Sequence, residues 1–105
     1  MKIEEQYPEV REFLEKLIDR GYNLIGFDDG GEDFLIQSND LDEIVEVIHE
    51  VNECTVELTK DNKFVELVFV LGNNQGEALS DYSCSEFLSN DIEEVSEEIY
   101  NKYYN

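Results

Sequence analysis

Hydrophobic residues recur every three or four positions in three segments of the chain, as they do on one face of a helix. The segments run from Pro8 to a stop at Gly21, from N-cap candidates at 38–40 to Asn52 or Glu53, and from about Asp91 onward, after a turn over 85–88. This spacing predicts three amphipathic helices.

Four other segments alternate between hydrophobic and polar residues, or are rich in β-branched and aromatic residues, which is typical of strands. They are Tyr22–Asp28, Asp33–Gln37, Cys54–Thr59 and Lys63–Leu71. Turn residues at 29–31 and 60–62 separate them in pairs, so we expect two hairpins.

The strand predicted at Lys63–Leu71 is hydrophobic on one face, and Val68 and Val70 make its other face partly apolar. We therefore expect it to be central in the sheet and covered on both sides. The next segment, Gly72–Ser83, has neither the helical nor the strand period and contains two glycines. It is predicted to be a loop.

The order helix, hairpin, helix, hairpin, helix predicts an α+β fold. We expect an antiparallel sheet of about four strands with three helices packed on it. The length fits one domain, and no linker or low-complexity segment divides the chain, so we predict a single acidic domain over residues 1–105.

Composition narrows the class of protein. Hydrophobic residues make up 41% of the chain, with six Phe and six Tyr, unlike the acidic, aromatic-poor sequences of disordered proteins. No apolar run approaches the ~18 residues of a membrane span, no signal peptide is recognisable, and two cysteines are too few for a disulfide scaffold. We expect a folded protein in the cytoplasm of the host cell.

Charge is the most informative property of the sequence. Twenty-seven acidic residues against seven basic ones give a formal net charge of -20, and Lys and Arg are absent from 21–59 and from 64–101. Solubility of a small domain needs only about 2–8 net charges, and a larger excess destabilises the compact state by self-repulsion. Such a surface repels nucleic acid and anionic membranes and attracts basic grooves, so the predicted partner is a basic nucleic-acid-binding protein.

The acidic residues gather on two predicted helices, opposite their apolar stripes. These partner-binding candidates are Asp42, Glu43, Glu46, Glu50 and Glu53 on the second helix, and Glu93, Glu94, Glu97 and Glu98 on the last. From Glu43 to Glu53 is about 15 Å at a rise of ~1.5 Å per residue, so that row carries one carboxylate every ~4–5 Å, against one phosphate per ~3.4 Å of a DNA strand. Two rows placed side by side by a sheet would approximate the charge of a short duplex. The alternatives are solvated helix faces and halophilic adaptation.

Aromatic residues offer specificity that charge alone does not. Asp81 and Tyr82 in the predicted loop, and Tyr100, Tyr103 and Tyr104 near the C-terminus, are candidate interface residues. The alternative is that Tyr103 packs in the core and the other tyrosines lie at its rim.

Catalytic, cofactor and metal motifs are weak. The acidic first turn lacks the calcium-loop pattern, so we expect solvated carboxylates at Asp28, Asp29, Glu32 and Asp33. His49 lies at the boundary of a helix face, Cys84 has no glycine elbow or recognisable base, and the glycines at 72–76 have no following Lys. We predict a binding protein rather than an enzyme, with no cofactor and no metal.

In charge, in size and in its two acidic helix faces, the chain resembles the small acidic anti-restriction and anti-CRISPR proteins of phages and mobile elements. This resemblance implies a DNA mimic that occupies the nucleic-acid groove of a defence nuclease or its guide complex. An immunity protein that neutralises a basic nuclease toxin, and an acidic protein-interaction module, are the alternative hypotheses.

Overall fold

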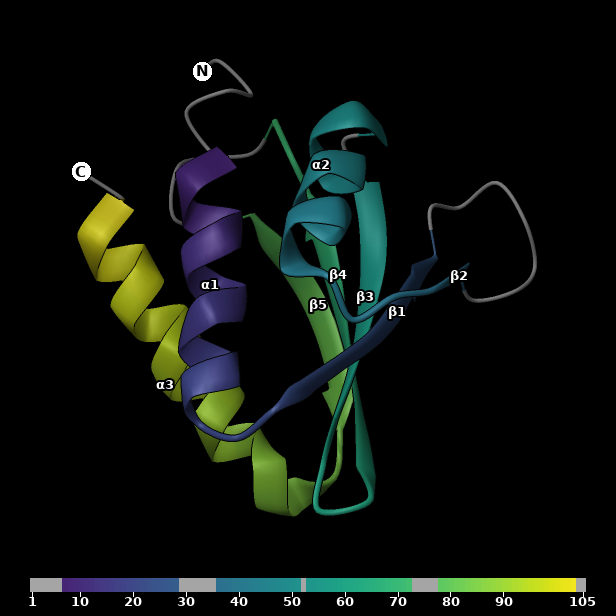
Figure 1. Cartoon of the computed structure of the whole chain (residues 1–105). Coiled ribbons are helices and arrows are strands. Elements are labelled where there is room, and N and C mark those ends of the chain that lie inside the picture. The colour runs from purple at the N-terminus through teal and green to yellow at the C-terminus, as the bar shows by residue number, and fades with distance from the viewer. Residues whose placement is uncertain (1–6, 29–35, 52, 73–77, 104–105) are drawn as a thin grey trace.

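The computed structural model describes residues 7–28, 36–51, 53–72 and 78–103, and in these ranges it has three helices and five strands (Figure 1). In chain order the elements are α1 (Tyr7–Asp19), β1 (Asn23–Asp28), β2 (Ile36–Gln37), α2 (Leu41–Val51), β3 (Glu53–Lys60), β4 (Lys63–Val70), β5 (Leu79–Cys84) and α3 (Glu86–Tyr103). The predicted α+β class is confirmed, with five strands rather than four.

The five described strands form one antiparallel sheet in the order β2-β1-β3-β4-β5. The three helices lie on the same side of this sheet, with α1 between α2 and α3 (Figure 1). The fold therefore has two layers, and β4 lies inside the sheet, between β3 and β5.

One hydrophobic core fills the space between the two layers. Alternate residues of β3 and β4 point inward, and the Phe13 ring of α1 meets the Phe69 ring of β4 edge-on, with 5.6 Å between centroids. The other fully buried members of this core include Leu14, Leu17, Ile44, Ile48, Val56, Leu58, Leu67, Ile92 and Ile99. The apolar stripes that predict the helices are thus the faces that the helices bury.

One tight backbone turn fixes the register of the central strands. The link between β3 and β4 is the two-residue turn Asp61–Asn62, whose φ angles of 53° and 66° are those of a type I′ hairpin. Its register pairs Lys60 with Lys63 and places Glu57 directly opposite Glu66.

Three predicted boundaries are wrong. The predicted loop Gly72–Ser83 contains β5, because a bulge at Ser80 interrupts the alternation of its inward residues. The last helix begins at Glu86 rather than at about Asp91. Glu53 is the first residue of β3 and not the last of the second helix, which ends at Val51.

The expectation that β4 is covered on both sides is not met by the described helices. No described helix lies over the second face of the sheet, which we call the open face (Figure 1). Val68 and Val70 lie there half-buried. Of the predicted return strand, positions 33–35 lie outside the described residues, and β2 covers only Ile36–Gln37.

Candidate interaction surfaces

The acidic row of α2 is exposed as predicted. Asp40, one of the predicted N-cap candidates, caps the helix: its Oδ1 accepts the backbone N–H groups of Asp42 at 2.9 Å and Glu43 at 3.4 Å. Glu43, Glu46 and Glu50 then follow on the solvent side, and none of them joins an ion pair among the described residues. We call these three the α2 row.

Asp42 differs from the α2 row, because a base of α1 neutralises it. Arg11 donates from Nη2 to Asp42 Oδ1 at 2.6 Å.

The predicted row on α3 is divided between two environments. Glu94 and Glu98 face α1 and the residue that follows it. Arg20 Nη1, just after the end of α1, lies 3.1 Å from Glu94 Oε2, and Lys16 Nζ of α1 lies 3.1 Å from Glu98 Oε2. Glu93 and Glu97 lie exposed elsewhere on the helix. The two predicted rows are therefore not adjacent: α1 lies between them, and its bases neutralise part of each.

Asp91, which the sequence marks only as a helix start, joins three parts of the fold. Its carboxylate accepts hydrogen bonds from Tyr22 Oη at 2.9 Å, Arg20 Nη1 at 2.9 Å and Lys60 Nζ at 3.3 Å. Burial alone would raise the pKa of Asp91, but these hydrogen bonds outweigh it and hold the pKa below its ordinary value. Asp91 is thus a structural centre, and it uses two of the chain's few bases.

Tyr82 and Glu93, two of the predicted site residues, meet in the structure. Tyr82 lies in β5 and donates from Oη to Glu93 Oε1 at 3.3 Å. Partial burial and then the charge of Glu93 raise the pKa of Tyr82, and the same two causes raise the pKa of Cys84. Because a thiol reacts as the thiolate, this environment makes Cys84 a poor nucleophile.

The open face of the sheet carries a second set of carboxylates. Register and alternation place five acidic residues on it: Asp28, Glu53, Glu57, Glu66 and Asp81. No Lys or Arg of the described strands shares this face, since Lys60 and Lys63 have the inward parity. Of these five, only Glu53 and Asp81 were predicted from the sequence to bind a partner.

Glu57 and Glu66 interact at the centre of this face. Partial burial, and then the negative charge of Glu66, raise the pKa of Glu57, and Asp28 adds to the effect. A signal for this pair exists in the sequence, because a two-residue turn at 61–62 requires Glu57 to face Glu66.

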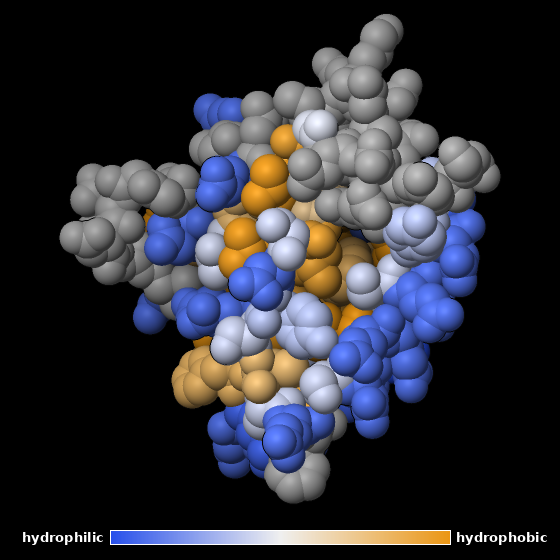
Figure 2. Space-filling model, turned by 180° about the vertical axis from the view of Figure 1, so that it is seen from behind, coloured by the Kyte–Doolittle hydropathy of each residue, from blue (hydrophilic) through white to orange (hydrophobic). Residues whose placement is uncertain are grey.

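Hydrophobic side chains lie among these carboxylates. Phe64 is 64% exposed, the largest value among the exposed large hydrophobic residues described, and Val68 and Val70 follow it along β4. Figure 2 shows hydrophobic residues gathered in the middle of the molecule's rear view, with hydrophilic residues on both sides. The open face is therefore both acidic and apolar.

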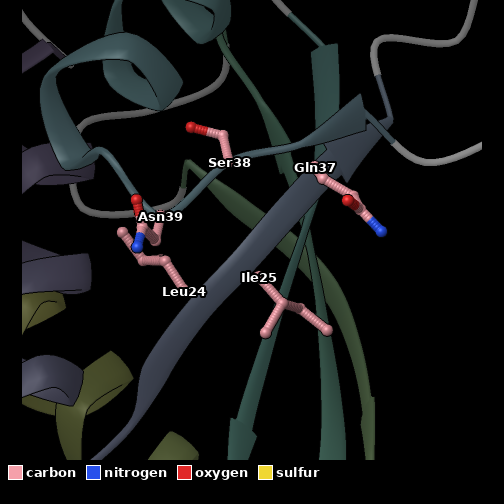
Figure 3. Close-up of a pocket in the computed structure, with 5 residues that line it drawn as sticks. All are labelled: Leu24, Ile25, Gln37, Ser38 and Asn39. Carbon is pink, nitrogen blue, oxygen red and sulfur yellow. The ribbon is translucent and has the colours of Figure 1, made fainter.

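Three shallow hollows follow β1. One of about 460 Å³ lies between β1 and the segment that leads to α2, lined by Leu24, Ile25, Gln37, Ser38 and Asn39 (Figure 3). None of these side chains is an acid or a base, so the hollow offers no catalytic group. A second, of about 270 Å³, adjoins it at Leu24 and Asn39.

The third hollow, of about 430 Å³, opens beside Phe64 at the end of the sheet. Asn23, Thr59, Asp61 and Asn62 complete its lining.

The remaining candidates contribute little. Tyr103 is half-buried and donates to Glu12 at 3.0 Å, Tyr100 is 38% exposed, and Tyr104 lies outside the described residues. Positions 29–33 of the acidic first turn and the glycine segment 73–76 also lie outside them. In the described ranges no three His, Cys, Asp or Glu side chains are placed to hold a metal ion, and no helix is long and apolar enough to cross a membrane.

The chain matches no protein-family model, no curated protein and no solved structure. Its function must therefore be inferred from the chemistry of these surfaces.

Proposed function

We propose that this chain is an inhibitor that binds the basic nucleic-acid-binding groove of a defence nuclease, or of its guide complex, in place of DNA. One observation supports this most directly. Arg11, Lys16, Arg20, Lys60 and Lys102 form ion pairs with acidic residues of α1, α2 or α3, whereas no ion pair among the described residues involves the α2 row, and no Lys or Arg of the described strands lies on the open face.

Because the bases are paired elsewhere, the negative field of the protein is concentrated at the α2 row and the open face. A charged face focuses its field on a partner of opposite sign and accelerates association, whereas intermixed bases would cancel that field at short range. A groove that binds DNA is lined by Lys and Arg, so it is the natural complement of such a face. Acting there, the protein would work in the host cytoplasm and need no cofactor or catalytic group.

An immunity protein for a single basic nuclease toxin is the second candidate, and the exposed Phe64 ring favours it. A phosphate backbone has no counterpart to a phenyl ring, and aromatic anchors are typical of interfaces with one dedicated protein partner. A DNA mimic should compete with many DNA sequences for its target, whereas an immunity protein should bind one toxin tightly.

A plating assay tests the proposed function. Bacterial strains that each carry one restriction or CRISPR system would express the chain and be challenged with phage that the system normally blocks. We expect plating to recover in at least one strain, and the purified nuclease or guide complex from that strain to lose DNA binding when the protein is added. If no strain recovers, and if co-expressed basic nuclease toxins also stay lethal, both candidate functions are wrong.

A further inference from the structure

The open face combines two features that each disfavour the isolated protein. Glu57 and Glu66 stand directly opposite one another, and like charges in that position destabilise a sheet. Phe64 is exposed beside them, with Val68 and Val70 half-buried along the same strand. An antiparallel sheet ordinarily has polar residues on its solvated face, so this apolar strip needs a separate explanation.

Charge decides what can cover this face. A second copy of the chain would bring the same carboxylates against each other, and nucleic acid would bring phosphates against them. A surface that offers Lys or Arg together with an apolar side chain would relieve the repulsion and bury the strip in one step.

Building on the proposed function, we propose that the open face of the sheet, rather than the acidic helices, is the docking surface, and that its occupant is a basic protein surface carrying an apolar side chain. Phe64 is the apolar anchor, and Glu57 and Glu66 receive the cations. The α2 row then acts at longer range, by steering the encounter.

The hollow beside Phe64 fits this assignment. Its volume of about 430 Å³ lies within the ~300–1,000 Å³ range of ligand pockets, and Asp61 lies in its wall. A long basic side chain entering it would place its aliphatic stem against the Phe64 ring and its charge near Asp61. An Arg or Lys over a phenyl ring also gains a cation–π attraction.

Two synthetic peptides of equal charge probe the surface. One alternates Lys with Gly and the other alternates Lys with Trp, and each is titrated into the ¹⁵N-labelled protein at about 0.15 M salt. We expect the largest amide shift changes at the Glu57, Glu66 and Val68 positions. The Lys–Trp peptide should bind about tenfold more tightly than the Lys–Gly peptide.

Phe64→Ser should reduce that preference to less than about threefold, whereas Ile18→Ser, which alters another exposed hydrophobic residue, should retain it.

Three double variants, each lacking two negative charges, locate the contact. Glu57→Gln with Glu66→Gln should weaken Lys–Trp binding about tenfold, and Glu46→Gln with Glu50→Gln less than about threefold. Glu15→Gln with Asp19→Asn, on the exposed side of α1, should weaken binding of the Lys–Trp peptide only as far as the loss of two net charges does.

Different failures have different meanings. If the shift changes and the loss of binding fall on the α2 row, the docking assignment is wrong while the proposed function stands. If neither peptide binds anywhere at this salt concentration, the proposed function is wrong as well. If dilution shows a dimer and the open-face amides shift with protein concentration alone, the occupant is a second copy and the proposal is overturned.

Discussion

Replacing Glu66 by Gln should stabilise the protein, because it removes one of two carboxylates that the hairpin register holds face to face. Directly opposite residues of an antiparallel pair have Cβ atoms about 4.5–5.5 Å apart. At ~5 Å, two unit charges repel by about 0.8 kcal/mol in bulk water and about 3 kcal/mol at the effective dielectric constant of a protein surface. Because Glu66 is exposed, the gain should lie near the lower figure, at about 1 kcal/mol.

For a domain of this size, a gain of about 1 kcal/mol corresponds to a rise in Tm of about 4–8 °C. Glu53→Gln is the matched control, because it removes a charge from the same face while its partner across the strands is the apolar Val70. Because both variants lose one charge, the difference between their Tm values reports local repulsion rather than net charge. Thermal unfolding at low salt and at ~1 M salt then tests whether this difference is electrostatic, since high salt screens it. NMR titration of Glu66→Gln should show the pKa of Glu57 returning toward its ordinary value of 4.5.

Repulsion between Glu57 and Glu66 is ruled out as the cause if Glu66→Gln is no more stable than Glu53→Gln, or if its advantage in stability is as large at high salt as at low salt. An unchanged pKa of Glu57 in that variant would show that burial alone, and not the facing carboxylate, raises it.

Asp91→Asn should lower the free energy of unfolding by about 2 kcal/mol, because three hydrogen bonds lose a charged acceptor. In chemical denaturation, a double-mutant cycle with Tyr22→Phe should show that the two effects are not additive. Additive effects would contradict a shared network around Asp91. In thermal scans, the combined contribution of Glu57 and Asp91 to stability should be largest between the ordinary pKa of Asp91, 3.8, and that of Glu57, 4.5. The pKa of Glu57 is raised in the folded state, so its contribution to stability is lost as pH rises through that folded-state pKa. The pKa of Asp91 is lowered, so its contribution to stability is lost as pH falls through that lowered pKa. A stability maximum at pH 7 or above would contradict this. Replacing Glu94 and Glu98 by Gln should lower Tm, because Arg20 pairs with Glu94 and Lys16 of α1 pairs with Glu98, and an unchanged Tm would show that these pairs contribute nothing. The protein should not shift bare duplex DNA in a gel at micromolar concentration and physiological salt, and a shift would contradict a surface that repels phosphates.

Local sequence predicted what depends on a single element. The apolar stripes of the helices are the buried faces, and the α2 row is exposed, because both follow from helical periodicity alone. The turn between β3 and β4 is equally local, but it was predicted over 60–62. Its two-residue form, Asp61–Asn62, is what places Glu57 opposite Glu66.

Features that depend on packing between elements were not predictable in the same way. Glu94 and Glu98 look like unpaired surface acids until α1 is placed beside α3, which brings Lys16 and Arg20 into reach. β5 could not be recognised from the sequence pattern, because the bulge at Ser80 shifts its inward residues out of strict alternation.

The open face shows a third kind of error. Val68 and Val70 suggested that a second layer covers β4, since sheets hydrophobic on both faces are usually buried. The described helices lie on one side of the sheet only. We infer instead that the exposed apolar residues of β4 contact a partner protein.

The most direct test of the open face as a docking surface for a basic protein is a DNA-displacement titration on a nuclease or guide complex that the chain inhibits. The double variant Glu57→Gln with Glu66→Gln would be compared with Glu15→Gln with Asp19→Asn, which has the same net charge. The account predicts that the sheet variant needs about tenfold more protein to displace DNA, and the α1 variant less than about twofold more. Equal displacement by the two variants would show that net charge alone governs binding, and would contradict a contact at the open face.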